Sequence, residues 1–204
     1  MVKKMKIMDK LIINKRIFLF LLTMSIIGVI TGCIFLIIIS KNNSIELNNE
    51  INSFINNINS LNYFESFKNI FSANVFYLLV IWLIGISIIG IPISLILFFI
   101  KSFSLGFTIS SFLLNYKLKG ILISLIYIIP CQIINIIITI YLLSFSLIIS
   151  FKLLESMIKK KSFTFSFISN YKKVLIFSIL IFLLSNLYEI FIMPYLFNIL
   201  HLIK

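Results

Sequence analysis

Long uncharged stretches alternate with polar segments along this chain, and they predict helices that cross a membrane. The clearest stretch covers 75–100, twenty-six residues without a charged side chain that end at Lys101. As a helix it is about 39 Å long, more than the roughly 30 Å hydrocarbon core of a bilayer. Gly85, Gly90 and Pro92 interrupt the stretch, and a membrane helix tolerates such residues where neighbouring protein packs against them. This stretch is therefore predicted to belong to a bundle.

The same pattern divides the whole chain into five crossings of an all-α, polytopic integral membrane protein. The predicted order is a basic N-terminus (1–16), a first span (17–39), an outer polar segment (40–74), a second span (75–100), a short third segment (102–116), a fourth span (120–150), a basic loop (151–173) and a fifth span (174–200). The third segment is only about 21 Å long as a helix, so it either crosses at a tilt or re-enters the same face. Pro130 predicts a kink or break inside the fourth span.

The positions of lysine and arginine predict the orientation of these spans. Basic residues precede the first span and fill the loop before the last one: Lys3, Lys4, Lys6, Lys10, Lys15, Arg16, Lys152, Lys159, Lys160, Lys161, Lys172 and Lys173. Cytoplasmic loops carry an excess of such residues, and five crossings place both groups on one side. The N-terminus is therefore predicted inside and the C-terminus outside, with Lys101 at an inner end.

Apolar residues recur at helical spacing in the outer segment, and asparagines fill the other faces. This pattern predicts an amphipathic helix at the membrane surface. It is either a connector that lies on the headgroups or a docking face for an extracytoplasmic partner. The candidate partner-binding residues are Ile51, Phe54, Ile55 and Ile58.

Small residues and a proline mark positions where membrane helices approach each other closely. The candidate helix-packing residues are Gly28, Gly32, Gly85, Gly90, Pro92, Ser102, Gly106 and Ser110. Their spacing fits packing within the chain or a seam between two copies. A homo-oligomer is therefore one of the partners that the sequence leaves open.

Composition changes this picture little. Of the 204 residues 61% are hydrophobic, which is more apolar surface than one soluble core can bury, so the partner of most side chains is the membrane itself. The net charge of +12 is compatible with nucleic-acid binding, but the positive residues cluster beside apolar stretches rather than in a basic, aromatic-rich soluble domain. Membrane topology explains the charge better, and no nucleic acid is expected as a partner.

Groups that carry catalysis are too sparse to form a site. The acids are scattered at Asp9, Glu46, Glu50, Glu65, Glu155 and Glu189. With His201 as the single histidine, no triad and no metal cluster can be assembled, so we expect no enzyme, no catalytic residue, no metal and no cofactor. Cys33 and Cys131 lie in predicted spans as small buried residues. The sequence ITGC at 30–33 resembles a bacterial lipobox, but the apolar stretch continues to Ile39 and favours an intact first span.

Glu189 and Asn135 are the candidate polar residues inside the membrane. A carboxylate at the centre of a membrane helix costs about 2.5–3.5 kcal/mol on insertion scales, so something must compensate for it. Glu189 either interacts with a proton, a cation or an amide such as Asn135, or it lies shallow and anchors the helix at the headgroups. Pro194 and Tyr195 support the shallow position.

Several motifs resemble one protein family. The sequence WLIGISIIGIP at 82–92, followed by KSFSLGF at 101–107, is similar to the stage II sporulation protein M family. KGIL at 119–122, IP at 129–130 and YE at 188–189 followed by Pro194 resemble the same family in the same order. Many members read Pro-His-Gly-x-x-Glu where this chain has PCQIIN at 130–135, so only the proline carries over.

This resemblance implies a non-enzymatic protein of the bacterial plasma membrane. In endospore formers such a protein anchors two peptidoglycan-degrading enzymes, stage II sporulation proteins D and P, at the septum while the mother-cell membrane engulfs the forespore. A hypothesis from another class is a permease-like subunit of an ATP-binding cassette transporter, or another small transport pathway, since broken helices and an acid such as Glu189 also occur there. Replacing Glu189 by Gln separates the two, because a transporter should lose activity while a scaffold should keep its partners.

Overall fold

The computed structural model describes residues 15–40, 63–159, 166–192 and 195. These residues are helical except in the turn at 85–89 and at Lys159, and none of them lies in a strand. The α-helices are α2 (Lys15–Ser40), α4 (Tyr63–Ile84), α5 (Gly90–Tyr127), α6 (Ile133–Ile158) and α7 (Ser166–Leu187), and the π-helical segments are η2 (Ile128–Gln132) and η3 (Tyr188–Ile192).

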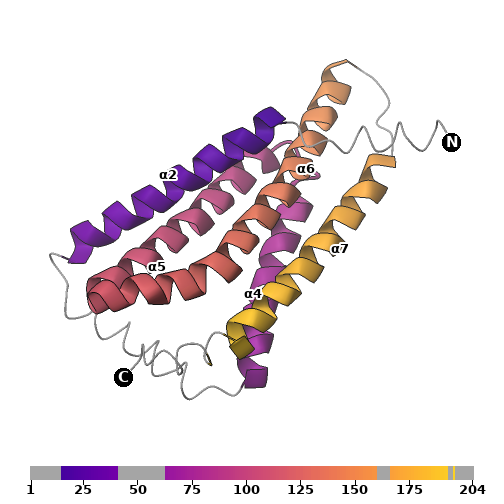
Figure 1. The fold of residues 1–204 in the computed structure, drawn as a ribbon. Coiled ribbons are helices and arrows are strands. Elements are labelled where there is room, and N and C mark those ends of the chain that lie inside the picture. Colours follow the sequence, from indigo (N-terminus) through magenta and orange to yellow (C-terminus); the bar gives the residue numbers. More distant parts are fainter. Residues whose placement is uncertain (1–14, 41–62, 160–165, 193–194, 196–204) are drawn as a thin grey trace.

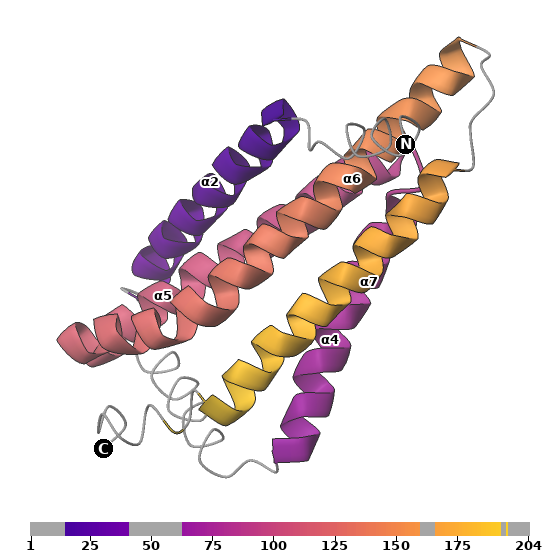
Figure 2. The same cartoon turned by 45° about the vertical axis from the view of Figure 1, so that its right-hand side comes forward.

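The helices lie side by side in one bundle, and successive helices run in opposite directions (Figures 1 and 2). In the described part of the chain, five stretches are long and apolar enough to cross a membrane: Lys15–Ser40, Phe67–Ile84, Gly90–Leu114, Tyr116–Ile158 and Tyr171–Ile192. This confirms the predicted fold class, a polytopic all-α membrane protein.

The two ends of the bundle differ in charge. At one end α2 begins, α6 ends and α7 begins, and we call it the basic end because it carries these exposed side chains: Lys15, Arg16, Lys159, Lys172 and Lys173. We call the opposite end, where α2 ends and α4 begins, the far end.

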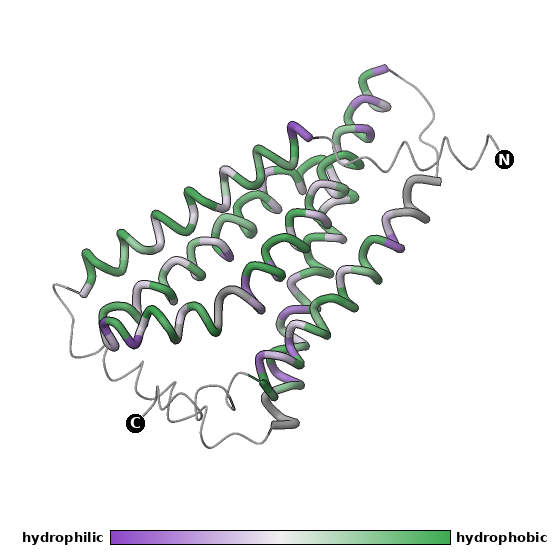
Figure 3. Tube along the Cα trace, viewed as in Figure 1, coloured by the Kyte–Doolittle hydropathy of each residue, from purple (hydrophilic) through white to green (hydrophobic). Residues whose placement is uncertain are grey.

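Apolar side chains cover the outside of the bundle. Figure 3 shows hydrophobic residues along most of the length of every helix. Phe76 and Leu184, for example, keep 68% and 64% of their surface exposed. Soluble monomers rarely expose contiguous apolar patches, whereas lipid chains are the natural contact for such side chains. The outer surface therefore faces the hydrocarbon of a bilayer.

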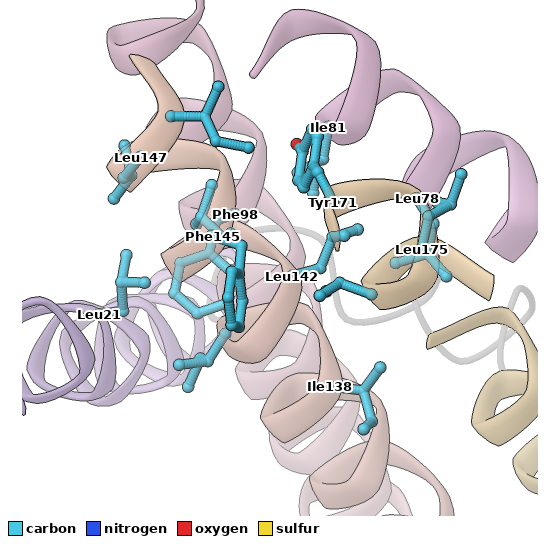
Figure 4. Packing of buried hydrophobic residues seen from close by; sticks show 14 of the residues in the cluster. Leu21, Leu78, Ile81, Phe98, Ile138, Leu142, Phe145, Leu147, Tyr171 and Leu175 are labelled. Atoms are coloured by element: carbon cyan, nitrogen blue, oxygen red, sulfur yellow. The ribbon is translucent and has the colours of Figure 1, made fainter. Parts of the chain in front are cut away.

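An apolar core joins all five helices (Figure 4). It contains Leu21 of α2, Leu78 of α4, Phe98 of α5, Leu142 of α6 and Leu175 of α7. The first four of these side chains are fully buried. Each of these five core residues lies closer to the basic end than to the far end of its candidate span. The core therefore fills the half of the bundle nearer the basic end.

The stretch predicted as one span over 75–100 is divided in the structure. Helix α4 ends at Ile84, and α5 begins at Gly90 after a tight turn. Within the turn the backbone N–H of Ser87 donates to the carbonyl of Ile84 at 2.9 Å, and Pro92 lies in the first turn of α5, where its missing N–H removes no helical hydrogen bond. Glycine and proline thus form a turn between two helices here rather than a kink within one helix. Two shorter spans fit the bilayer better than one helix of about 39 Å.

The third segment, predicted over 102–116 as a tilted crossing or a re-entrant one, is lengthened by this division. It becomes the full span Gly90–Leu114, which has the length of an ordinary crossing. The chain then reverses at Lys117, whose φ of 48° is not helical. Lys101, predicted at an inner end, lies near the middle of this span.

The remaining boundaries also shift. Pro130 falls in η2, so the predicted break in the fourth span takes the form of a π-helical segment, and α6 continues past 150 to Ile158. The span Phe67–Ile84 includes the end of the predicted outer segment 40–74, which places Asn74 inside the bundle. Helix α7 begins before 174, and most of the predicted stretch beyond Ile192 lies outside the described residues.

Candidate functional site: a polar cluster between the helices

Polar side chains gather between the helices on the far side of the apolar core. The cluster consists of Asn74 of α4, Lys101 of α5, Cys131 of η2, Asn135 of α6, Ser185 and Asn186 of α7 and Glu189 of η3. We call this group the polar cluster. Its members come from six of the helical segments, so only the folded bundle brings them together.

Lys101 is the charged centre of the cluster. Its Nζ lies 4.2 Å from the centroid of the Tyr77 ring and 4.7 Å from that of the Phe182 ring. Aromatic faces attract a cation through their quadrupole. Lys101 also interacts electrostatically with Glu189. The lysine charge, which is costly at this depth, is thus compensated by two rings and a carboxylate.

One face of α7 and η3 supplies the other polar groups. Ser185, Asn186 and Glu189 follow Phe182 at intervals of three or four residues, so they share a side of the helix. The Nδ2 of Asn74 donates a hydrogen bond of 3.0 Å to Oδ1 of Asn186, which ties α4 to α7. Asn186 is fully buried, and its own Nδ2 has no hydrogen-bond partner in the described structure.

Two hydrogen bonds join η2 to α7. The Oγ of Ser185 donates to the carbonyl of Cys131 at 3.3 Å, and the Sγ of Cys131 donates to the carbonyl of Ser185 at 3.7 Å. A π-helical segment that contains a proline leaves backbone carbonyls without their usual helical partners, so side-chain donors are needed there. Cys131 is fully buried. It acts as a structural donor at the break.

Asn135, the other predicted intramembrane polar residue, lies one turn after Cys131 on α6. It is 2% exposed, and its Oδ1 has no hydrogen-bond partner among the described residues. Thr139 Oγ1 donates to its backbone carbonyl at 2.7 Å. Asn135 was one of several partners that the sequence allowed for Glu189; the structure gives Glu189 an electrostatic interaction with Lys101 and leaves the amide oxygen of Asn135 unsatisfied.

A second set of polar contacts holds the turn at 85–89. The Oγ of Ser150 donates to the carbonyls of Gly85 and Ser87, at 2.8 and 3.1 Å. Tyr171 stacks on Trp82 and donates to its carbonyl at 3.2 Å. A Cβ on Gly85 would meet the Tyr171 hydroxyl at 2.5 Å and the Oγ of Ser146 closer still. Gly85 is therefore a close-packing residue, as predicted from its size.

The predicted small residues of the first and third spans face each other. A Cβ added to Gly28 would lie 2.8 Å from Cβ of Ser102, and one added to Gly32 would lie 3.0 Å from the Phe107 nitrogen. A Cβ on Gly106 would collide with the backbone of Val29. These residues form a seam between α2 and α5 within one chain. A contact between two copies would need a different surface.

The other predicted packing residues behave differently. Gly90 is buried beside the carbonyl of Ile84, where the turn closes, and Ser110 is buried on α5. Pro92 is exposed and serves the start of α5 rather than a helix contact. The candidate partner-binding residues Ile51, Phe54, Ile55 and Ile58 lie outside the described residues.

Sequence reasoning missed Lys101, Asn74 and Asn186 as parts of the cluster. Asn74 and Lys101 were assigned to the polar sides of span boundaries, because a hydropathy pattern treats a polar residue as the end of an apolar stretch. The signal was present in the turn residues: Gly85 and Pro92 allow the chain to reverse earlier, and Lys101 then falls inside the next span. No local signal distinguishes Asn186 from a lipid-facing asparagine.

The match to known proteins concerns the whole bundle. A family model described as Stage II sporulation protein M matches residues 17–194, which include every described helix except the first two residues of α2 and Tyr195. The chain belongs to the stage II sporulation protein M family. No curated protein sequence and no solved structure matches it.

Membership of the stage II sporulation protein M family accounts for the overall character of the chain. It is a sporulation-related membrane protein, and the family match covers both the turn at 85–89 and the polar cluster. Within the described residues no group of three or more His, Cys, Asp and Glu side chains is placed to hold a metal ion. The polar cluster offers one ammonium group, one carboxylate and amides, which suit hydrogen bonding and hydration.

Proposed function

We propose that this protein is a non-enzymatic membrane scaffold that recruits and anchors peptidoglycan-degrading enzymes at the septal and engulfing membrane during endospore formation. The observation that carries the proposal is the family match over residues 17–194. The enzymes are those that the family resemblance implies, stage II sporulation proteins D and P. The protein itself contributes position rather than chemistry.

The packing of the bundle supports a role as an anchor. Helices α2 and α5 meet through glycines that admit no larger side chain without displacement of backbone. Such close contacts favour one rigid arrangement of membrane helices. The charges of Lys101 and Glu189 interact with each other within the chain. An acid that already has an internal partner does not require a transport path to explain it, and this weakens the permease alternative.

The charge of the two ends supports the proposed orientation in the plasma membrane. The basic end carries the exposed Lys15, Arg16, Lys159, Lys172 and Lys173. Among the described residues of the far end, the exposed cations are Lys68, Lys117 and Lys119. The excess at the basic end supports a cytoplasmic position for that end. The far end then lies outside, on the side of the cell wall, where wall enzymes act.

Affinity purification from sporulating host cells tests the scaffold function. A tagged chain is extracted in a mild detergent, and the proteins that accompany it are identified by mass spectrometry. We expect the wall hydrolases to be recovered with the chain. Because the candidate docking face is apolar, the double variant Phe54→Asp with Ile58→Asp should lose the hydrolases while the protein still inserts and accumulates.

The matched control places the same charges on another face of the same segment. Asn52→Asp with Asn59→Asp adds two acids at positions that helical spacing puts away from Phe54, and hydrolase recovery should stay at the wild-type level. Recovery of an ATP-binding cassette ATPase without any hydrolase would contradict the scaffold function. Equal recovery with both double variants would contradict only the docking face.

A further inference from the structure

The polar cluster contains more hydrogen-bonding capacity than the protein satisfies. Asn186 is fully buried and Asn135 nearly so, yet Nδ2 of Asn186 and Oδ1 of Asn135 have no protein partner in the described structure. An unpaired buried amide is destabilising, and the cost is higher where lipid surrounds the bundle. Such groups in folded proteins are usually satisfied by ordered water.

These two amides lie beside the charged residues rather than in separate places. Asn186 is next to Ser185, which is hydrogen-bonded to Cys131, and Asn135 follows Cys131 by one helical turn. Glu189 is one turn beyond Ser185 and interacts electrostatically with Lys101. Lys101 and Glu189 are only partly buried. The unsatisfied amides and the two charges therefore belong to one region at the level of η2 and η3.

The surroundings of this region are asymmetric. Toward the basic end lie fully buried apolar side chains, among them Leu78, Phe98 and Leu142. The far ends of α4 and α5 lie apart in both views, whereas their other ends meet at the turn (Figures 1 and 2). Because the apolar core lies between the polar cluster and the basic end, water that reaches the cluster comes from the far end.

We propose that the polar cluster is a hydration site, in which water molecules from the aqueous phase at the far end bridge Asn135, Asn186, Lys101 and Glu189. The site takes water as its ligand and is closed toward the basic end by the apolar core. It explains how a lysine near the middle of a span is stable, because both charges keep contact with water. This inference does not depend on the scaffold function, since it concerns the interior of the bundle.

Thiol accessibility tests the proposal, because a thiol reacts as its thiolate and ionises in water but not in hydrocarbon. In a Cys33→Ser, Cys131→Ser background, Ser185→Cys places a thiol in the polar cluster. Two controls lie on the same helix. Ser178→Cys is two turns away in the buried apolar half, and Leu184→Cys has the same depth as Ser185 but faces lipid. A small, charged, membrane-impermeant methanethiosulfonate is added to intact protoplasts, and modification is followed by mass spectrometry of the purified chain.

We expect Ser185→Cys to react about tenfold faster than either control, since only its thiol is hydrated. Equal rates at Ser185→Cys and Leu184→Cys would overturn the proposal, and so would fast modification of Ser178→Cys, which would mean that the core is no barrier. If Ser185→Cys fails to accumulate, Asn186→Cys in the same background replaces it, because the side chain of Asn186 has an unsatisfied donor in the polar cluster. Modification of Asn186→Cys faster than Leu184→Cys then supports the site, and equal rates rule it out.

Discussion

At the scale of single residues, the unusual feature is a lysine near the middle of a membrane span. Lys101 is stabilised by the rings of Tyr77 and Phe182 and by the charge of Glu189. Each partner comes from a different helix, so the lysine links α4, α5 and the end of α7. Removing one charge of such a pair is more damaging than removing both, because the remaining charge has lost its compensation.

Glu189→Gln is therefore expected to lower the free energy of unfolding by roughly 1–3 kcal/mol, less than a fully buried pair would lose, because Lys101 and Glu189 are only partly buried. The double variant Lys101→Met with Glu189→Gln should recover most of this loss. Thermal unfolding in detergent, followed by the fluorescence of the single tryptophan, Trp82, measures both.

Glu155→Gln provides the control, since it breaks the ion pair of 2.7 Å with Lys159. Both side chains of this pair are exposed to solvent. Glu155→Gln should lower the free energy of unfolding by about 0.5 kcal/mol or less. A Glu189→Gln protein as stable as the wild type would contradict the view that Glu189 compensates the charge of Lys101. A double variant less stable than the Glu189→Gln protein would contradict it too.

At the scale of the elements, α2 is held chiefly by α5, through the glycine seam. Gly106 is the tightest point, because the backbone of Val29 occupies the place of its absent side chain. The Sγ of Cys33 also donates to the carbonyl of Gly106 at 3.3 Å. Small residues matter here because membrane helices gain their affinity from close packing rather than from the hydrophobic effect.

Gly106→Val should force α2 away from α5 and destabilise the protein by roughly 1–3 kcal/mol, as overpacking does in other cores. Ser104→Val is the matched control, since Ser104 lies on the exposed side of the same helix and should change stability by about 0.5 kcal/mol or less. The same unfolding assay compares them. A Gly106→Val protein with wild-type stability would show that the seam does not hold α2.

At the scale of the whole molecule, the turn at 85–89 and the reversal at Lys117 together keep the number of crossings at five. The turn places α4 and α5 in two separate spans, and the full-length third span then carries the chain to the far end. Three candidate spans lie between the start of α2 and the reversal at Lys117, so we expect these two points on opposite sides of the membrane.

Single thiols can locate the two ends. In the Cys33→Ser, Cys131→Ser background, Leu118→Cys lies beside the reversal and Met157→Cys near the end of α6, at sites that are 80% and 71% exposed. An impermeant maleimide added to intact protoplasts should label Leu118→Cys fully, and Met157→Cys only after permeabilisation. Labelling of both from outside, or of neither, would show that the stretch Tyr116–Ile158 between the two sites does not cross, and labelling of Met157→Cys alone would show that the third segment does not cross.

The sequence by itself determined the solvent and the fold class, because apolar stretches of bilayer length leave no other environment for this chain. It predicted five crossings but left open whether the third segment crosses or re-enters. The motifs at 82–92 and 101–107 also identified the family that the match over 17–194 shows. The tendency of Gly85 and Gly106 to lie at helix contacts could be read from their size alone.

Only the tertiary structure decided where the spans begin and which polar residues meet. Gly85, Gly90 and Pro92 are compatible with a kinked helix and with a turn, and the hydrogen bonds from Ser150, on a helix distant in sequence, stabilise the turn. Moving that boundary places Lys101 near mid-span, and packing then brings it to Glu189 of another helix. Hydropathy is a local property of the chain, whereas compensation of a buried charge depends on residues far apart in the sequence, and so it emerges only when the helices pack.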